Sequence, residues 1–209
     1  MTRRGHAVSR GRAWAARVWP LFLPAFIMLF PALEAKPASA ADALPATELS
    51  IAPAREAARS HDAAQALLAQ GRPDEALATI ERGLQQVPDD LRLQFQRGIV
   101  LARLGRTDDA IAAFVELTQR FPELPEPYNN LATLYAQQGD LDRAEQALQE
   151  ALRAMPAYSL AHENLGDLQL RLAERSYRRA VQADGGNDSA RERLARVQAL
   201  ITELPAERR

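Results

Sequence analysis

The sequence has 209 residues, of which 47% are hydrophobic and 25% charged, and its formal net charge is −1. It contains no cysteine, which excludes disulfides, thiol chemistry and lipid attachment through a cysteine. Residues 41–209 carry 20 Arg against 26 Asp and Glu, an acidic balance that argues against a nucleic-acid-binding surface.

Residues 1–40 have the layout of a cleavable secretory signal peptide. Five arginines precede an apolar run over residues 18–33, and a small-x-small motif, Ala38-Ser39-Ala40, follows the run. Three prolines interrupt this run, which is shorter than the roughly 20 apolar residues of a membrane-spanning helix. We expect a bacterial Sec-type signal and a periplasmic or secreted protein. The alternative is an uncleaved segment that anchors the chain in the inner membrane.

Residues 41–53 are predicted to be a linker, because they contain Pro45 and Pro53 and no apolar stripe at helical spacing. Helical periodicity begins at about Ala54. The first helix is expected to run from about Ala54 to Gln70. Its partner is expected to start at about Pro73, because a proline is favourable at a helix start, where its missing N–H has no partner anyway.

Residues 54–184 repeat with a period of 34. Five kinds of residue recur at this interval. They are the turn glycines, the closing prolines, small residues of the first helix, alanines five positions after each glycine, and bulky apolar residues four positions after each alanine. In that order, these residues are Gly71, Gly105 and Gly139; Pro88, Pro122 and Pro156; Ala64, Gly98 and Ala132; Ala76, Ala110 and Ala144; and Ile80, Phe114 and Leu148. Several residue types that share the same 34-residue spacing indicate a repeat protein and not an ordinary helical bundle.

The pattern resembles the tetratricopeptide repeat family. The resemblance implies an all-α fold, a right-handed α-solenoid of helix–turn–helix units at about residues 57–90, 91–124, 125–158 and 159–184. Small residues let the two helices of a hairpin approach closely, and a single hairpin cannot bury its own apolar stripe, so the units must stack. The family's large aromatic near the start of the first helix is matched only by Tyr128; the other units have Ser60, Gln94 and His162.

The fourth unit lacks five residues, which include the turn glycine. No Gly, Pro, Asn or Ser lies between Asp167 and Arg175. We therefore predict that its two helices fuse into one, from about Ser159 to Ala183, and a tight turn near Leu172 is the alternative.

Residues 185–209 are expected to form a capping helix and a tail. Ser189 and Glu192 have the spacing of a capping box, and an apolar stripe follows them. A helix with a polar outer face shields the end of a repeat stack.

Catalytic candidates are few. Beyond the leader the histidines are His61 and His162, about 100 residues apart, and a metal site needs three or four convergent ligands. Acidic pairs such as Asp108-Asp109 are expected at helix starts, where they complement the helix dipole. The sequence shows no phosphate-binding glycine loop and no nucleophile triad. We predict a protein that is not an enzyme, without cofactor or metal.

The resemblance places a partner-binding surface on the concave face, which first-helix residues line in this family. We define the first-helix surface by the corresponding residues here. They are His61, Gln65, Arg92, Phe95, Ile99, Arg103, Asn129, Asn130, Thr133, Gln137, Glu163 and Asp167, with Ala58 and Leu68 at its N-terminal end. The amides are suited to the backbone of an extended peptide, and Arg92 or Arg103 to a carboxylate. The competing interpretation is that these positions are ordinary solvated residues.

Family members that clamp chaperone C-termini use lysine and asparagine at defined first-helix positions. Those positions here are His61, Gln65, Gln96, Glu126 and Asn130, a single match. We therefore predict an exported adaptor for a protein or peptide of the cell envelope, and not a chaperone clamp. The alternatives are a structural homo-oligomer assembled through the fourth unit and the last helix, in which Leu160 or Leu170 would be exposed, and an accessory subunit of an envelope enzyme complex.

Overall fold

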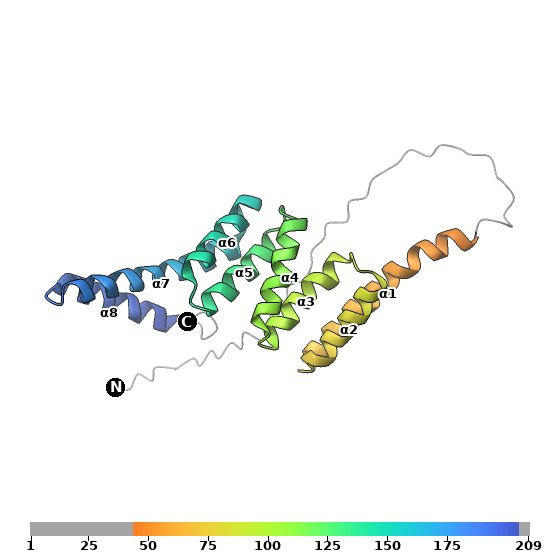
Figure 1. Ribbon diagram of the computed structural model, residues 1–209, viewed down its shortest axis with the longest axis horizontal. Coiled ribbons are helices and arrows are strands. Elements are labelled where there is room, and N and C mark those ends of the chain that lie inside the picture. Colours follow the sequence, from red (N-terminus) through yellow and green to blue (C-terminus); the bar gives the residue numbers. More distant parts are fainter. Residues whose placement is uncertain (1–43, 205–209) are drawn as a thin grey trace, which may run out of the picture. The chain divides into compact units, whose positions relative to one another are not determined.

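The computed structural model describes residues 44–204, and within this range every regular element is an α-helix. The eight helices are α1 (Leu44–Ala69), α2 (Pro73–Gln86), α3 (Leu91–Arg103), α4 (Thr107–Arg120), α5 (Pro125–Gln137), α6 (Leu141–Ala154), α7 (Ser159–Ala183) and α8 (Asp188–Glu203) (Figure 1). The all-α prediction is confirmed. The predictions for the leader concern residues outside the described range.

Consecutive helices pack in pairs. α1 lies against α2, α3 against α4, α5 against α6 and α7 against α8, and each pair also contacts the next through α2–α3, α4–α5 and α6–α7. Every first helix after α1 therefore packs both on its own partner and on the second helix before it. This arrangement joins the apolar stripes into one continuous core. None of the helices in residues 44–204 combines the length and the apolar character that a membrane span requires.

The repeated small residues lie inside this core. Ala76, Ala110 and Ala144 are 0%, 0% and 1% exposed, and the bulky residues four positions later are buried beside them. Ala64, Gly98 and Ala132, from the first helices, are also buried. The residues that recur every 34 positions in the sequence are therefore the residues at which the helices pack closely in the structure.

Each regular hairpin turns at a glycine in the left-handed region. The φ angles of Gly71, Gly105 and Gly139 are 72°, 72° and 79°, a conformation that L side chains rarely adopt. The residue after each glycine donates its backbone N–H to a carbonyl five residues earlier, as Arg106 does to Leu101 at 2.9 Å. This is the Schellman arrangement, which satisfies the carbonyls at the end of the first helix.

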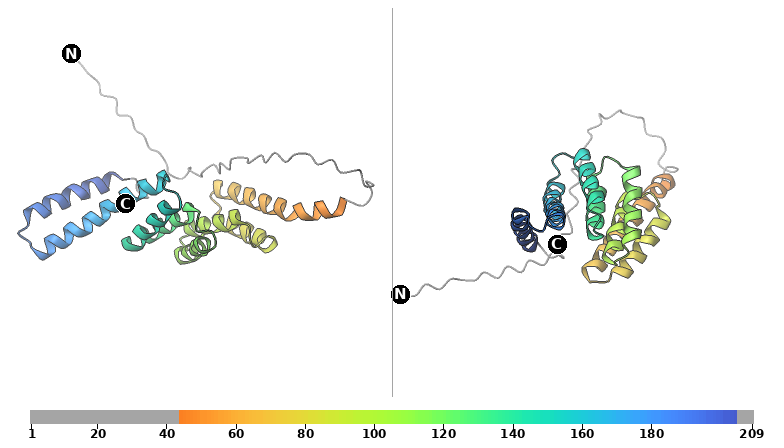
Figure 2. Two further views of the ribbon diagram at one scale, coloured as in Figure 1. Left: turned by 90° about the horizontal axis from the view of Figure 1, so that it is seen from above. Right: turned by 60° about the vertical axis from the view of Figure 1, so that its left-hand side comes forward.

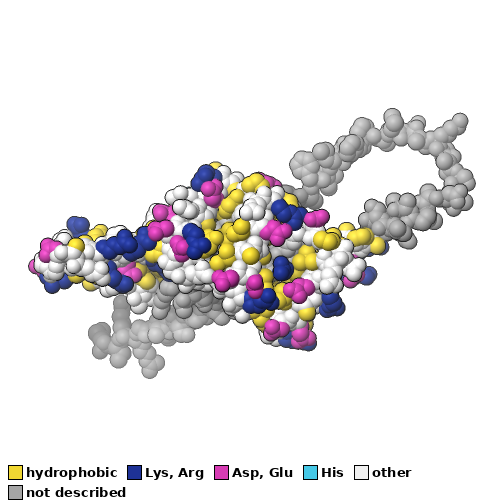
Figure 3. Space-filling model, viewed as in Figure 1, with side chains coloured by type: hydrophobic (Ala, Val, Ile, Leu, Met, Phe, Trp, Pro, Cys, Tyr) yellow, Lys and Arg dark blue, Asp and Glu magenta, His cyan; other side chains and the backbone are white. Residues whose placement is uncertain are grey.

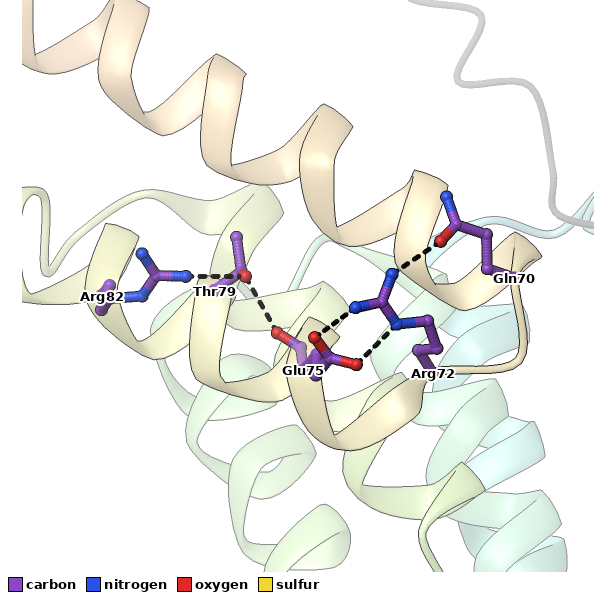
Figure 4. Close-up of polar contacts among 5 residues, drawn as sticks. All are labelled: Gln70, Arg72, Glu75, Thr79 and Arg82. Carbon is purple, nitrogen blue, oxygen red and sulfur yellow. Dashed lines mark hydrogen bonds and ion pairs between the residues drawn. The ribbon is translucent and has the colours of Figure 1, made fainter.

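Polar contacts hold the first of these turns in place. The Arg72 guanidinium donates to both carboxylate oxygens of Glu75 and to the amide oxygen of Gln70, which joins the end of α1 to the start of α2 (Figure 4). The hydrogen bond from Arg72 lowers the pKa of the Glu75 carboxyl. Further along α2, Thr79 accepts a hydrogen bond from Arg82 and donates one to the carbonyl of Glu75.

The start of α1 differs from the prediction. The whole segment 41–53 is predicted to be a linker, but α1 begins at Leu44 and continues through Pro53. Pro45 falls in the first turn, where a backbone N–H has no intrahelical partner. Pro53 removes one backbone hydrogen bond inside the helix without ending it. The two prolines were misread as signs of a non-helical segment.

The prediction of a fused fourth unit is confirmed, because α7 is one unbroken helix over Ser159–Ala183. After it the chain reverses, and α8 lies beside α7 (Figure 2). This terminal hairpin buries few side chains. Ala161 and Leu168 are the buried residues of α7, and Ala190 is the buried residue of α8.

The capping box predicted at Ser189 is wrong. Helix α8 begins two residues before the prediction requires, at Asp188, and its N-cap is Asn187. The side-chain oxygen of Asn187 accepts the backbone N–H of Ala190 at 2.9 Å, whereas the predicted capping box would have satisfied the backbone N–H groups of Ser189 and Glu192. Asp90 and Asp140 cap α3 and α6 in the same way.

Side-chain amides also link first helices of neighbouring units. Gln96 of α3 donates to the backbone carbonyl of His61 in α1 at 3.3 Å. One repeat position is shared by Gln96, Asn130 and Asn164, and Asn164 of α7 likewise reaches back 35 residues, to the oxygen of Asn129 at 2.8 Å. Asn130 bonds instead to the carbonyl of Glu126 in its own helix. Hydrogen bonds at this position therefore join units one to two and three to four.

The contact around Gly98 generates a prediction. A Cβ atom at Gly98 would lie 2.7 Å and 2.8 Å from ring atoms of Phe114, which is 1% exposed. We expect Gly98→Ala to lower the free energy of unfolding by about 1–3 kcal/mol. Gly166, in α7, is the matched control, because a Cβ there meets nothing within 4 Å. Gly166→Ala should be neutral or stabilising by up to about 1 kcal/mol. Urea unfolding followed by circular dichroism measures both, and equal effects would contradict the packing assignment.

The bond between Asn164 and Asn129 generates a second prediction. Asn129 is 6% exposed, so Asn164→Ala leaves a buried oxygen without this donor and should cost about 1–3 kcal/mol. A double-mutant cycle with Asn129→Ala should show a coupling of at least about 0.5 kcal/mol. Asn130→Ala, at the same repeat position as Asn164, should cost less because Asn130 bonds only within its own helix. Additive effects in the cycle would show that this link does not stabilise the stack.

Candidate functional site

The first-helix surface comes from the four first helices, α1, α3, α5 and α7. Direct contacts between α1 and α3 assemble its N-terminal half, and direct contacts between α5 and α7 assemble its C-terminal half. The predicted residues differ in how far they are exposed. Arg92, Arg103, Thr133, Gln137 and Glu163 are exposed; His61, Gln65, Phe95, Ile99, Asn130 and Asp167 are partly buried; and Asn129 is buried.

In α1 the predicted polar residues are engaged with one another. The His61 side chain is 13% exposed, one of its ring nitrogens lies 3.3 Å from the amide nitrogen of Gln65, and the other lies 3.3 Å from the carboxylate of Asp62. Both ring nitrogens therefore have protein neighbours. This end of the surface offers a ligand little unoccupied hydrogen-bonding capacity.

In α3 two exposed arginines flank an apolar centre. Phe95 packs edge-on against Phe114 with ring centroids 5.6 Å apart, and Ile99 also packs against the core. Arg92 lies in the first turn and Arg103 in the last, and neither forms an ion pair with a residue of the described range. These two guanidinium groups are the cations of this surface most accessible to a carboxylate.

In α5 the structure changes the role of one predicted residue. The Asn129 side chain is buried and its oxygen accepts from Asn164, so Asn129 holds two units together and does not face a ligand as predicted. Asn130 and Thr133 bond to carbonyls of their own helix. Gln137, in the last turn, is the exposed amide of this group.

In α7 the surface ends in two carboxylates. Glu163 is exposed and Asp167 is partly buried, one turn further along the same helix. The charge along the first-helix surface therefore changes from basic in α3 to acidic in α7.

A second polar cluster was not predicted from the sequence. Four arginines of α7, Arg171, Arg175, Arg178 and Arg179, line a hollow of about 320 Å³ beside the start of α6. Figure 3 shows Lys and Arg side chains gathered in a row over α7. The spacing of four, three and one places them on one helical face, and this spacing was visible in the sequence once the fused helix was predicted.

Between Leu44 and Leu204, no three His, Asp or Glu side chains converge in a way that could hold a metal ion. Burial raises the pKa of the Tyr158 phenol well above its ordinary value, and burial raises that of Tyr128 less. Both tyrosines pack against the core, so the shifts follow from their structural positions.

Comparisons with known proteins identify the fold family. Two models of tetratricopeptide repeats match residues 61–125 and 101–168, which together span just over half of the chain. A TPR repeat-containing thioredoxin, TTL4 of Arabidopsis thaliana, is 33% identical over 107 residues. That match covers 51% of this chain but only 16% of the relative, so it concerns the repeats and not the remainder of that protein.

Solved structures share the arrangement of helices. The first tetratricopeptide domain of Spaghetti (RPAP3), bound to an HSP90 peptide, has a TM-score of 0.53 at 18% identity over 57% of this chain and 94% of that one. TTC0263, a thermophilic TPR protein of Thermus thermophilus, has a TM-score of 0.51 at 24% identity over 69% of this chain and 82% of that one. At these identities the likeness concerns the fold. Proteins with this repeat generally bind proteins or peptides and are typically non-catalytic. The chain belongs to the tetratricopeptide repeat superfamily.

Proposed function

We propose that this protein is a non-catalytic adaptor of the cell envelope that captures a protein or peptide on the first-helix surface. The observation that carries the proposal is the graded charge of that surface. Exposed Arg92 and Arg103 lie without ion pairs on α3, and the carboxylates Glu163 and Asp167 lie on α7. Such a surface suits an extended segment with an acidic group at unit two and a basic group towards unit four.

The chemistry available at each end supports this orientation. A guanidinium group binds a carboxylate through two parallel hydrogen bonds, and Phe95 and Ile99 between the arginines offer partly exposed apolar area. Gln137 supplies an exposed amide for a peptide backbone. The contact is therefore part apolar and part charged, as is usual for peptide recognition.

A chaperone clamp is not proposed, although one structural neighbour binds an HSP90 peptide. Of the five positions that hold a terminal carboxylate in such clamps, Gln96 here is 6% exposed and points its amide at the backbone of α1. His61 and Gln65 contact each other, and Glu126 carries the charge that would repel a carboxylate. A partner with an internal acidic residue fits better than one with a free C-terminus.

A homo-oligomer remains the second candidate, because α8 has an uncovered apolar residue. Leu200 is 47% exposed, whereas Leu160 and Leu170 are partly buried. Light scattering on the mature chain distinguishes the candidates. A monomer at micromolar concentration favours the adaptor. A stable dimer that the Leu200→Glu substitution dissociates favours the oligomer.

The export proposal generates a prediction. Because Ala38-Ser39-Ala40 has the form of a signal-peptidase site, we expect the mature chain to begin at Ala41 and to fractionate with the periplasm or the medium. Mass spectrometry of the intact protein from a bacterial host that expresses the full gene measures the N-terminus. Retention of all 40 leader residues in the membrane fraction would instead support an uncleaved anchor.

The first-helix surface generates another prediction. Replacing both Arg92 and Arg103 with glutamate should weaken capture of an envelope partner by tenfold or more, at about 1.4 kcal/mol per tenfold, with an unchanged helical signal. Crosslinking pull-down with quantitative mass spectrometry identifies the partner and measures its loss. Arg82→Glu with Arg193→Glu is the matched control, because these exposed arginines also lack ion pairs within the described residues and lie on α2 and α8, which contribute no residue to the first-helix surface. Undiminished capture by the first variant would remove this surface as the site.

A further inference from the structure

The continuous core of the stack ends inside α7. Leu168 is its last buried side chain, and Leu172 is the last partly buried apolar residue that packs against it. Among the described residues after Leu172, no buried or partly buried apolar side chain belongs to this core, and even the buried Ala190 lies outside it. We call residues 173–203, which comprise the second half of α7, the turn and α8, the capping segment. In Figure 1 this segment extends past the end of the stack.

The capping segment has a small apolar interior of its own. Tyr177 and Val181 of α7 are partly buried, and so are the α8 residues Leu194, Val197 and Ile201. Among the described helices, α8 packs extensively only on α7. A single pair of helices cannot bury its own apolar stripes, which is why these side chains keep some exposure. Apolar burial therefore holds the two helices of the segment together but attaches them only weakly to the stack.

A bidentate ion pair joins the capping segment to α6. The Arg175 guanidinium donates two hydrogen bonds, of 2.7 Å and 3.1 Å, to the carboxylate of Asp142 in the first turn of α6. These bonds lower the pKa of the Asp142 carboxyl. At the same repeat position one unit earlier, Asp108 accepts a single hydrogen bond from the Gln138 amide at 3.1 Å. The weakly buried junction therefore has the stronger polar contact, in the geometry for which exposed ion pairs contribute measurably.

The surroundings of this ion pair allow it to form and break. Glu145 of α6 places a second negative charge near Arg175, and Arg179 places a second positive charge near Asp142. Asp140 also lies close, but it is already paired with an arginine of α6. The Asp142 and Arg175 side chains are 70% and 32% exposed, so water replaces the contact without leaving a buried charge. The pair is therefore defined by its geometry and not by an excess of either charge.

We propose that the capping segment opens by local unfolding while the stack up to Leu172 stays folded, and that the Arg175–Asp142 pair is the latch that opposes this opening. Segments with few buried apolar contacts open at lower free energy than the core to which they are attached. Release of the latch also removes one wall of the hollow beside Leu141, because Arg175 lines it. The device is a cap whose opening exposes the end of the core, and it does not rest on the proposed adaptor function.

Hydrogen–deuterium exchange of the purified full chain, followed by mass spectrometry of peptic fragments, tests the proposal. We expect the protection of amides in residues 173–203 to be at least about tenfold lower than that of amides in α5 and α6. The second half of α7 and α8 should share one level of protection, because they open together. The distinctive expectation is a step in protection near Leu172, inside a helix that is unbroken in the structure.

The latch is tested by Arg175→Gln, which should speed exchange in the capping segment by about two- to fivefold and leave α3 and α4 unchanged. The double variant with Asp142→Asn should add little to this effect in the segment, because both changes remove the same pair. Arg193→Gln is the matched control. It makes the same charge change at an exposed position of α8 that forms no ion pair with a described residue, and it should alter exchange by less than about 1.5-fold.

Three results would overturn the proposal. Equal protection in the second half of α7 and in α5 and α6 would show that the segment unfolds only with the whole stack. Rapid exchange confined to α8, with α7 protected to its end, would show fraying of the last helix and no opening unit. Equal effects of Arg175→Gln and Arg193→Gln would remove the ion pair as the latch. Circular dichroism checks that each variant is folded, and the protection step in the unaltered chain needs no variant.

Discussion

The structure depends on the close approach of helices where a side chain is very small. Ala76, Ala110 and Ala144 are buried at the same point of three successive hairpins, and Gly98 lies directly against the ring of Phe114. Because protein interiors are densely packed, one extra carbon at such a point must displace a neighbour. The 34-residue spacing keeps these points in register, so the stripes of all units merge into one core. The first-helix surface is positioned by this register.

The end of the array shows how the same design gives a different surface when a turn is lost. Five missing residues leave α7 without a left-handed glycine, and a helix without such a break continues. Its second half packs against α8 and reaches α6 through Arg175, and the buried residues of α7, Ala161 and Leu168, both lie in its first half. The face that would have been covered by a regular second helix carries arginines. Loss of a structural signal therefore creates a charged feature that the other units do not have.

The fold could be predicted from the sequence because its determinants are local and repeated. Left-handed glycines, buried alanines and the fused helix each follow from residues within one or two turns of each other. The errors arise where the same residues are compatible with more than one conformation. Pro53 ends many helices but only weakens α1, and Asn187 precedes Ser189 as a cap of equal quality. For the site, helical position could not distinguish Asn129, which faces a neighbouring helix, from residues that face solvent, because this depends on packing between units.

The central claim is that buried small residues at the repeat interval hold the stack together. Urea unfolding of Ala144→Trp, followed by circular dichroism, tests it most directly, with Gln149→Trp on the exposed face of α6 as the control. The account predicts that Ala144→Trp lowers the free energy of unfolding by about 3 kcal/mol or more or abolishes the cooperative transition, while Gln149→Trp changes it by less than about 0.5 kcal/mol. An Ala144→Trp protein as stable as the control would contradict it.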